Sequence, residues 1–245
     1  MNKKVFIALI VLVLAALACT LSPVTNPTPQ PPTNGGGVPT PIVGGEVFTQ
    51  TPDNIGANGL EILFKDDFSN PDSGWDRGSN DSYLTDYATG GYRINVIPPT
   101  YAAFANPYQT FQNDVRIEVD ATKIGGPDDN AFGVQCRYQD VDNYYYFYIS
   151  SDGFVGIGID KAGEKTIIST SDGSMVDDSS IIQGAATNHL RADCIGSTLT
   201  LYVNGTQAAA ATDSTFTGGD VGLVARTFSI GGTDILFSNF FVYKP

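Results

Sequence analysis

The residues with the clearest potential for ligand chemistry lie between positions 131 and 160, in the run AFGVQCRYQDVDNYYYFYISSDGFVGIGID. Tyr144, Tyr146 and Tyr148 occupy alternate positions, so a strand here places all three phenols on one face. A buried phenol needs a partner for its hydroxyl, which favours a face that meets water or a ligand. The alternative is that the tyrosines only pad a sheet face beneath a loop.

Two glycines add a second feature to this stretch. Asp152-Gly153 predicts a tight turn into a strand over residues 154–160, where Gly156 and Gly158 leave one face nearly bare. A glycine-floored trough beside a row of tyrosines suits a flat ligand. The whole run reads as three consecutive antiparallel strands.

Arginines and cysteines on the neighbouring strands extend the pattern. Cys136 and Cys194 each share a face with apolar residues, which predicts a buried disulfide closing a loop of about sixty residues and stabilising the fold by about 4 kcal/mol. Two free buried thiols are the alternative. By the same alternation Arg137 and Arg191 point away from the core, and they join the tyrosines on one surface if their strands are neighbours.

Composition limits the classes of function. The formal net charge of −13 disfavours binding to phosphate backbones, so we expect no nucleic-acid partner. The 27 glycines and many Asp, Asn, Ser and Thr residues, without a long segment of 3.6-residue period after the N-terminus, predict an all-β protein. About 185 residues form one domain of ordinary size for a β-sandwich, which we expect to be a monomer.

The N-terminus predicts export and anchoring. Residues 1–18 combine Lys3 and Lys4 with an apolar run too short to span a bilayer, as in a signal peptide. Ala16-Leu17-Ala18-Cys19 resembles the bacterial lipobox, in which the cysteine is diacylated and becomes the first mature residue. The expected location is therefore the outer side of a bacterial membrane, with lipidated Cys19 as the anchor. An ordinary secretory signal with an incidental cysteine is the alternative.

Residues 19–59 predict a linker. They are rich in proline, with Gly35 to Gly37 in the middle, and too poor in large apolar residues to form a core. Such a segment is extended at about 3.1 Å per residue and holds the domain away from the membrane. The folded domain is expected over residues 60–245.

Strand signals recur along the whole of this domain. Runs rich in β-branched and aromatic residues alternate with Gly, Pro or Asn turns, which is the rhythm of a sandwich. Asn204-Gly205, between YV and TQ, is the strongest hairpin signal in the chain.

Five segments carry a resemblance to a known superfamily: DDFSNPDSGW, RYQDVDNYYYFYISSDG, LYVNGT, GGDVGLVA and ILFSNFFVYK. In their order they resemble the concanavalin A-like lectin/glucanase superfamily, which includes laminin G-like and 3-keto-disaccharide hydrolase-like domains. The resemblance implies a two-sheet antiparallel jelly-roll sandwich with a carbohydrate-binding sheet. It also implies a structural calcium ion near the chain ends, for which Asp67 and Asn239 are the candidate ligands.

Catalytic signatures are weak. The family 16 glucanase pattern requires three carboxylates on one strand, whereas here only Glu118 and Asp120 match. A serine triad would have to use His189, the single histidine, but the chain has no G-x-S-x-G nucleophile elbow. One histidine without a pair of thiolates also disfavours a zinc site. The sequence thus favours a binding protein over an enzyme, and we expect no catalytic residues.

Three functional hypotheses follow from these residues. The first is a membrane-anchored, lectin-like module that binds a glycan, because aromatic rings suit sugar C–H surfaces and Arg suits hydroxyls or uronates. The second is a glycoside hydrolase of the 3-keto-disaccharide type, which requires two carboxylates on one groove. The third is an envelope interaction module with a flat sheet. The ligand-binding residues expected under the first are Arg137, Tyr144, Tyr146, Tyr148, Arg191 and Trp75.

Overall fold

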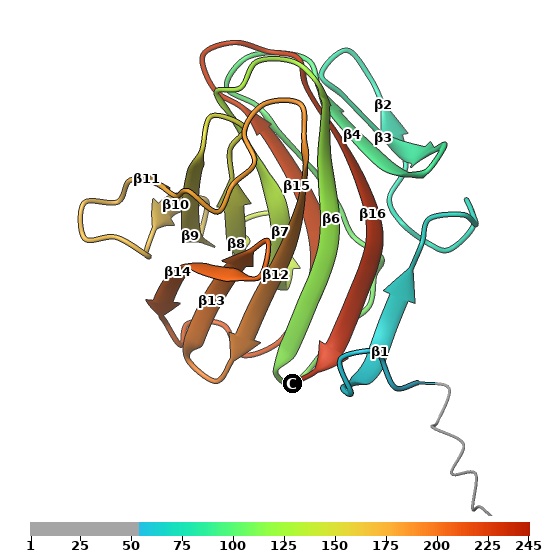
Figure 1. The fold of residues 1–245 in the computed structure, drawn as a ribbon, viewed down its shortest axis with the longest axis vertical. Coiled ribbons are helices and arrows are strands. Elements are labelled where there is room, and N and C mark those ends of the chain that lie inside the picture. Colours follow the sequence, from blue (N-terminus) through green and yellow to red (C-terminus); the bar gives the residue numbers. More distant parts are fainter. Residues whose placement is uncertain (1–53) are drawn as a thin grey trace, which may run out of the picture. The chain divides into compact units, whose positions relative to one another are not determined.

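The computed structural model describes residues 54–245, which form two antiparallel β-sheets packed face to face (Figure 1). Every regular element among these residues is a strand, so the predicted all-β sandwich is confirmed. No helix in this range is long and apolar enough to cross a membrane. The expected signal peptide, Cys19 and most of the expected linker lie outside the described residues.

The larger sheet has nine strands and contains both ends of the domain. Its long central strands are β6 and β16, and β1 pairs with β16 at the chain ends. In spatial order the sheet contains β14 (Thr206–Thr212), β13 (Thr198–Val203), β12 (Thr187–Ile195), β6 (Val115–Gly125), β16 (Thr233–Lys244), β4 (Gly91–Val96), β3 (Tyr83–Ala88) and β2 (Gly78–Ser79), with β1 (Glu61–Asp66) beside β16.

The smaller sheet has seven strands and contains the tyrosine-rich stretch. The predicted three-strand meander is confirmed, because β7, β8 and β9 pair antiparallel in sequence order. In spatial order the sheet contains β10 (Glu164–Ile167), β9 (Phe154–Lys161), β8 (Asn143–Ile149), β7 (Asn130–Asp140), β15 (Asp220–Thr227) and β5 (Ala102–Ala105), with β11 (Val176–Asp177) beside β9.

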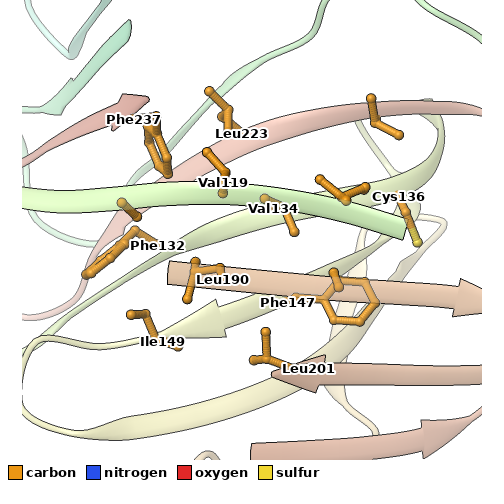
Figure 2. Packing of buried hydrophobic residues seen from close by; sticks show 14 of the residues in the cluster. Val119, Phe132, Val134, Cys136, Phe147, Ile149, Leu190, Leu201, Leu223 and Phe237 are labelled. Carbon is orange, nitrogen blue, oxygen red and sulfur yellow. The ribbon is translucent and has the colours of Figure 1, made fainter. Parts of the chain in front are cut away.

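The hydrophobic core lies between the two sheets (Figure 2). Phe132, Phe147 and Ile149 of the smaller sheet are at most 1% exposed and belong to the same cluster as Val119 and Leu190 of the larger one. Their positions follow the predicted alternation, because successive side chains of a strand point to opposite faces. The alternate residues of β8 therefore face outward, away from the core.

One covalent bond joins the sheets. Cys136 on β7 and Cys194 on β12 form the predicted disulfide, at a sequence separation of 58. Both cysteines are fully buried. Their placement on the apolar faces of their strands was enough to predict the pair, because the inner faces of a sandwich oppose each other.

Two local features refine the predicted boundaries. The Asn204-Gly205 hairpin forms as expected between β13 and β14, with φ of 50° and 84° at its two residues, the left-handed conformation that such turns require. At the start of the domain Ile55 bridges to Glu61, so the folded domain includes residues that the sequence assigned to the linker.

Candidate functional site

A pocket of about 610 Å³ lies on the outer face of the seven-stranded sheet, a size typical of small-ligand sites. We call it the outer-face pocket. Its apolar lining consists of Tyr146, Tyr148, Phe154, Ile167, Met175 and Phe228. Its polar side chains are Asp129, Ser150, Asp152, Lys165, Ser174 and Arg226.

Two tyrosines of β8 form the floor of the pocket. The rings of Tyr146 and Tyr148 lie 4.6 Å apart between centroids, and each residue is only 3% exposed. The ring of Tyr146 lies against Gly158, where an added Cβ would stand 2.1 Å from the ring carbon Cζ. Gly158 is thus needed so that the neighbouring strand can hold Tyr146 flat on the sheet.

The open trough predicted beside the tyrosines is not present. Gly158 is covered by Tyr146, and a Cβ on Gly156 would meet Met175 at 2.9 Å and Ile167 at 3.0 Å. Ile167 ends β10, and Met175 precedes β11, so both belong to the segment that follows β9 and folds back over the outer face. The alternative given by the sequence, tyrosines covered by a loop, is therefore correct for much of the row. The remaining hollow lies toward the Tyr148 end of the row.

The floor keeps unused hydrogen-bonding capacity. The buried hydroxyl of Tyr148 has no hydrogen-bond partner among the described residues. Burial raises the pKa of Tyr148, and it raises the pKa of Tyr146 to about 12, because a phenolate loses its hydration there. Both phenols hence retain their protons at physiological pH, and the donor of Tyr148 is unpaired.

The walls of the pocket combine exposed aromatic surface with carboxylates. Phe154, the first residue of β9, is 39% exposed. Asp129, in the loop before β7, accepts a 3.4 Å hydrogen bond from the hydroxyl of Ser229, and Asp152, in the β8–β9 turn, accepts one from the hydroxyl of Ser150. Both carboxylates have further lone pairs that can accept ligand hydroxyls.

The two cations of the pocket differ in their partners. Lys165 on β10 forms an ion pair with the fully buried carboxylate of Asp160 and lies 5.8 Å from the ring centroid of Tyr144. Arg226 on β15 forms no ion pair within residues 54–245, and its buried Nε has no hydrogen-bond partner there. Its guanidinium carbon lies 5.5 Å from the ring centroid of Phe228.

Arg137 does not belong to this surface, contrary to the sequence prediction. A bulge shifts the β7–β8 register between Cys136 and Asp140, and Arg137 has φ of 52°, so its side chain leaves the expected alternation. Arg137 is 3% exposed. Its guanidinium donates to the carbonyl oxygens of Phe216, Cys194 and Gly196 and to the carboxylate of Asp114.

Arg191 lies on the other sheet. The sequence placed it beside the tyrosines if its strand adjoined theirs, but β12 pairs with β6 and β13. There Arg191 forms an ion pair with Asp193 and stacks over Tyr202 at 4.1 Å. The expectation of one surface shared by Arg137, Arg191 and the tyrosines is therefore wrong.

Tyr144 and Trp75 are also withdrawn from solvent. Tyr144 is fully buried on the outer face and does not line the pocket. Trp75 is 4% exposed in the main core, and its indole N–H donates to Asp66 at 2.9 Å. Of the six expected ligand-binding residues, only Tyr146 and Tyr148 line the pocket.

The expected calcium ligands lie near each other without forming a cation site. Asp67 and Asn239 line one hollow, together with Lys65, whose positive charge opposes cation binding. The amide nitrogen of Asn239 donates to Asp120 at 2.7 Å, and the adjacent Asp66 carboxylate is occupied by donors such as the Trp75 indole. Calcium takes six or more oxygens as a rule, and the residues present do not supply them. No group of three or more His, Cys, Asp or Glu residues within 54–245 is arranged to hold a metal ion.

Sequence reasoning missed most of the pocket. Arg226 shares the outward parity of Val224 on a strand that the sequence did predict, so its direction was readable. The strand beside it could not be predicted, because β15 pairs with β7 across about ninety residues of sequence. Phe154 begins the third strand of the predicted meander and Asp129 precedes the first, and neither carried a pattern that marked it as a ligand contact.

Comparisons with known proteins extend the picture at the level of fold. No family model matches the sequence, and no curated protein is similar to it in sequence. The carbohydrate-binding module CBM66 from Bacillus subtilis superimposes with a TM-score of 0.55 at 19% identity, over 70% of this chain and 96% of that one. A Bacillus subtilis protein of unknown function with a galectin-like fold gives 0.55 at 10% identity, over 74% and 95%.

A third solved structure is similar over part of its length. The GlcNAcα1-4Gal-releasing endo-β-galactosidase from Clostridium perfringens has a TM-score of 0.57 at 11% identity, over 78% of this chain and 64% of that one. At such identities the similarity establishes the fold alone. The expected jelly-roll class of sandwich is thereby confirmed.

Proposed function

We propose that this chain is a carbohydrate-binding module displayed outside a bacterial membrane, with a glycan in the outer-face pocket. The observation that carries the proposal is the combination, in one pocket of about 610 Å³, of exposed aromatic surface with both acceptors and donors. A sugar ring has apolar C–H faces and a rim of hydroxyls, so it needs this combination.

Each part of the pocket has a role in such a complex. Phe154 offers an exposed ring for a sugar face. Asp129 and Asp152 accept hydroxyl protons, and the Tyr148 hydroxyl and Arg226 guanidinium donate. The solved carbohydrate-binding module and endo-β-galactosidase with this fold support the same class of ligand.

Membrane attachment belongs to the same proposal. The lipobox-like Ala16-Leu17-Ala18-Cys19 segment supports acylation of Cys19, and the proline-rich linker after it supports a domain held away from the bilayer. A tethered module of this kind would keep a glycan, or a cell that bears it, near the surface.

A cysteine variant tests the anchor. We expect Cys19→Ser to move the protein from the membrane fraction to the soluble fraction, because several acyl chains on one residue provide stable attachment and a serine accepts none. Fractionation of expressing cells followed by immunoblotting measures this. Membrane retention of the variant, or a soluble wild-type protein, would contradict the anchor while leaving the glycan site open.

Removal of one aromatic wall tests the site. We expect Phe154→Ala to weaken glycan binding by roughly tenfold to a hundredfold, because burying a Phe ring contributes about 1.5–3 kcal/mol. The full chain is screened against neutral and acidic polysaccharides, and affinities for each bound polymer are measured by calorimetry. Phe154 is partly exposed, so the variant should fold.

Ile124→Ala is the matched control, since Ile124 is 48% exposed on β6 of the other sheet. Equal loss in both variants would place the ligand elsewhere or indicate a general effect on folding. A screen in which no polysaccharide binds would refute the proposed function.

A glycoside hydrolase is the second candidate. The observation that favours it is the presence of two carboxylates, Asp129 and Asp152, on one pocket. The same screen distinguishes the two functions, because a hydrolase releases soluble sugar from a polymer whereas a binding module does not. The third hypothesis required a flat outer face, and residues 54–245 form a pocket there instead.

A further inference from the structure

Arg226 differs from every other arginine in the chain. The remaining five form ion pairs with aspartates, in the pairs Arg77–Asp86, Arg93–Asp234, Arg116–Asp193, Arg137–Asp114 and Arg191–Asp193. Arg226 has no ion pair within residues 54–245, although the chain contains 26 acidic residues. It is also the arginine that lines the outer-face pocket.

The strand pairing places Arg226 close to a second unpaired donor. On β7 its register partner is the small residue Ala131, which is followed by Gly133 two positions along on the same outer face. Beside that glycine stands Tyr148, whose buried hydroxyl has no partner. Two unpaired donors, the Arg226 guanidinium and the Tyr148 hydroxyl, therefore belong to one pocket.

A buried donor without a partner destabilises the protein, so an unpaired donor in a pocket indicates that a ligand supplies the acceptor. A desolvated donor without a partner has lost its hydrogen bonds to water without replacement, and the cost is larger when the donor is charged. The nearby acids do not remove this cost, because neither Asp129 nor Asp152 forms an ion pair with Arg226. An oxyanion on a ligand would supply the missing partner. The planar guanidinium matches the two oxygens of a carboxylate better than it matches single hydroxyls.

We infer that the ligand of the outer-face pocket is an acidic sugar, a uronate whose carboxylate pairs with Arg226 and accepts a hydrogen bond from the Tyr148 hydroxyl. This inference rests on the proposed function and names its ligand class. Asp129 and Asp152 then receive hydroxyls of the same sugar, so each charge in the pocket has a partner of suitable chemistry.

The acidity of the chain makes the inference unusually testable. A protein with a formal net charge of −13 repels polyanions over its surface, so general electrostatic attraction cannot produce such binding. Tight binding of an acidic polymer would hence require a local cation such as Arg226.

The experiment compares polygalacturonate with its methyl-esterified form, which differs only in the carboxylate. For the full chain we expect polygalacturonate to bind about tenfold to a hundredfold more tightly, because hydrogen bonds between charged groups are the stronger kind. Arg226→Gln should abolish this preference. Arg226→Lys should retain part of it, since the charge remains and the planar fork is lost. Arg77→Gln, which removes the same charge from an exposed ion pair elsewhere, should leave it unchanged.

Five outcomes overturn the inference. Equal binding of the two polymers does so, as does an undiminished preference in Arg226→Gln. A preference for dextran sulfate over polygalacturonate also does so, because the group that Arg226 binds would then be a sulfate ester and not a carboxylate. Binding of a neutral polymer that is lost in Phe154→Ala but insensitive to Arg226→Gln overturns the acidic ligand and leaves the proposed function standing. Binding of no polymer refutes both.

Discussion

Replacing Trp75 with alanine is expected to lower the free energy of unfolding by about 3–5 kcal/mol, the usual cost of removing a buried large aromatic side chain. The ring packs against Phe240 at 4.9 Å and Phe68 at 5.1 Å between centroids, both in edge-on geometry. Its N–H also satisfies part of the buried carboxylate of Asp66. The variant thus loses contacts in the core and one hydrogen bond.

A conservative variant separates these two contributions. Trp75→Phe retains most of the ring contacts and loses the N–H, so we expect a smaller loss of about 1–3 kcal/mol. Urea unfolding of both variants is monitored by circular dichroism, because neither variant retains the only tryptophan and its fluorescence. A loss below about 1 kcal/mol for Trp75→Ala would show that the ring does not support the core.

The same variant addresses the role that the sequence assigned to this residue. If Trp75 contacted a ligand, Trp75→Ala would reduce glycan affinity even under conditions where it stays folded. We expect unchanged affinity there, because Trp75 does not line the outer-face pocket.

Loss of the disulfide is the second large expected effect. Replacing Cys136 and Cys194 together with alanine should lower the free energy of unfolding by about 4 kcal/mol, the chain-entropy value for a closed loop of this length. The bond joins β7 to β12 and so links the two sheets directly. Urea unfolding of the double variant and of the wild type measures the difference.

Reduction of the wild-type protein provides an independent check. Both cysteines are fully buried, so a reductant should act slowly on the folded domain and rapidly once urea unfolds it. The reduced wild type should then unfold at the same urea concentration as the double variant. Equal stability of oxidised and reduced protein would mean that the bond does not constrain the unfolded chain.

Arg137 explains why the disulfide is not the only link at this position. Arg137 directly follows Cys136 in the sequence. Its guanidinium donates to the carbonyl oxygens of Cys194, near the end of β12, and of Gly196, just beyond that strand. A residue that the sequence assigned to ligand binding is thus a structural bridge between sheets. The bulge that redirects it depends on one residue at positive φ, which strand alternation cannot anticipate.

The amino-acid sequence by itself determined the elements and their inner faces. The alternation of Phe132, Val134 and Cys136 on one strand, and of Leu190, Ala192 and Cys194 on another, identified the buried faces and with them the disulfide. The Asn-Gly pair likewise predicted its hairpin. These signals are local, because the two-residue period of a strand and the φ requirements of a turn are properties of short segments.

Only the tertiary structure decided which outer faces adjoin and which remain open. Arg226 reaches the tyrosines because β15 pairs with β7, and Arg191 does not because β12 pairs within the other sheet. The covering of Gly156 by Ile167 and Met175 depends on how the chain after β9 folds back. Such pairings join segments distant in sequence, and the outer face of a sheet carries no periodic signal that specifies its neighbour, so the pocket could emerge only once the strands were assembled.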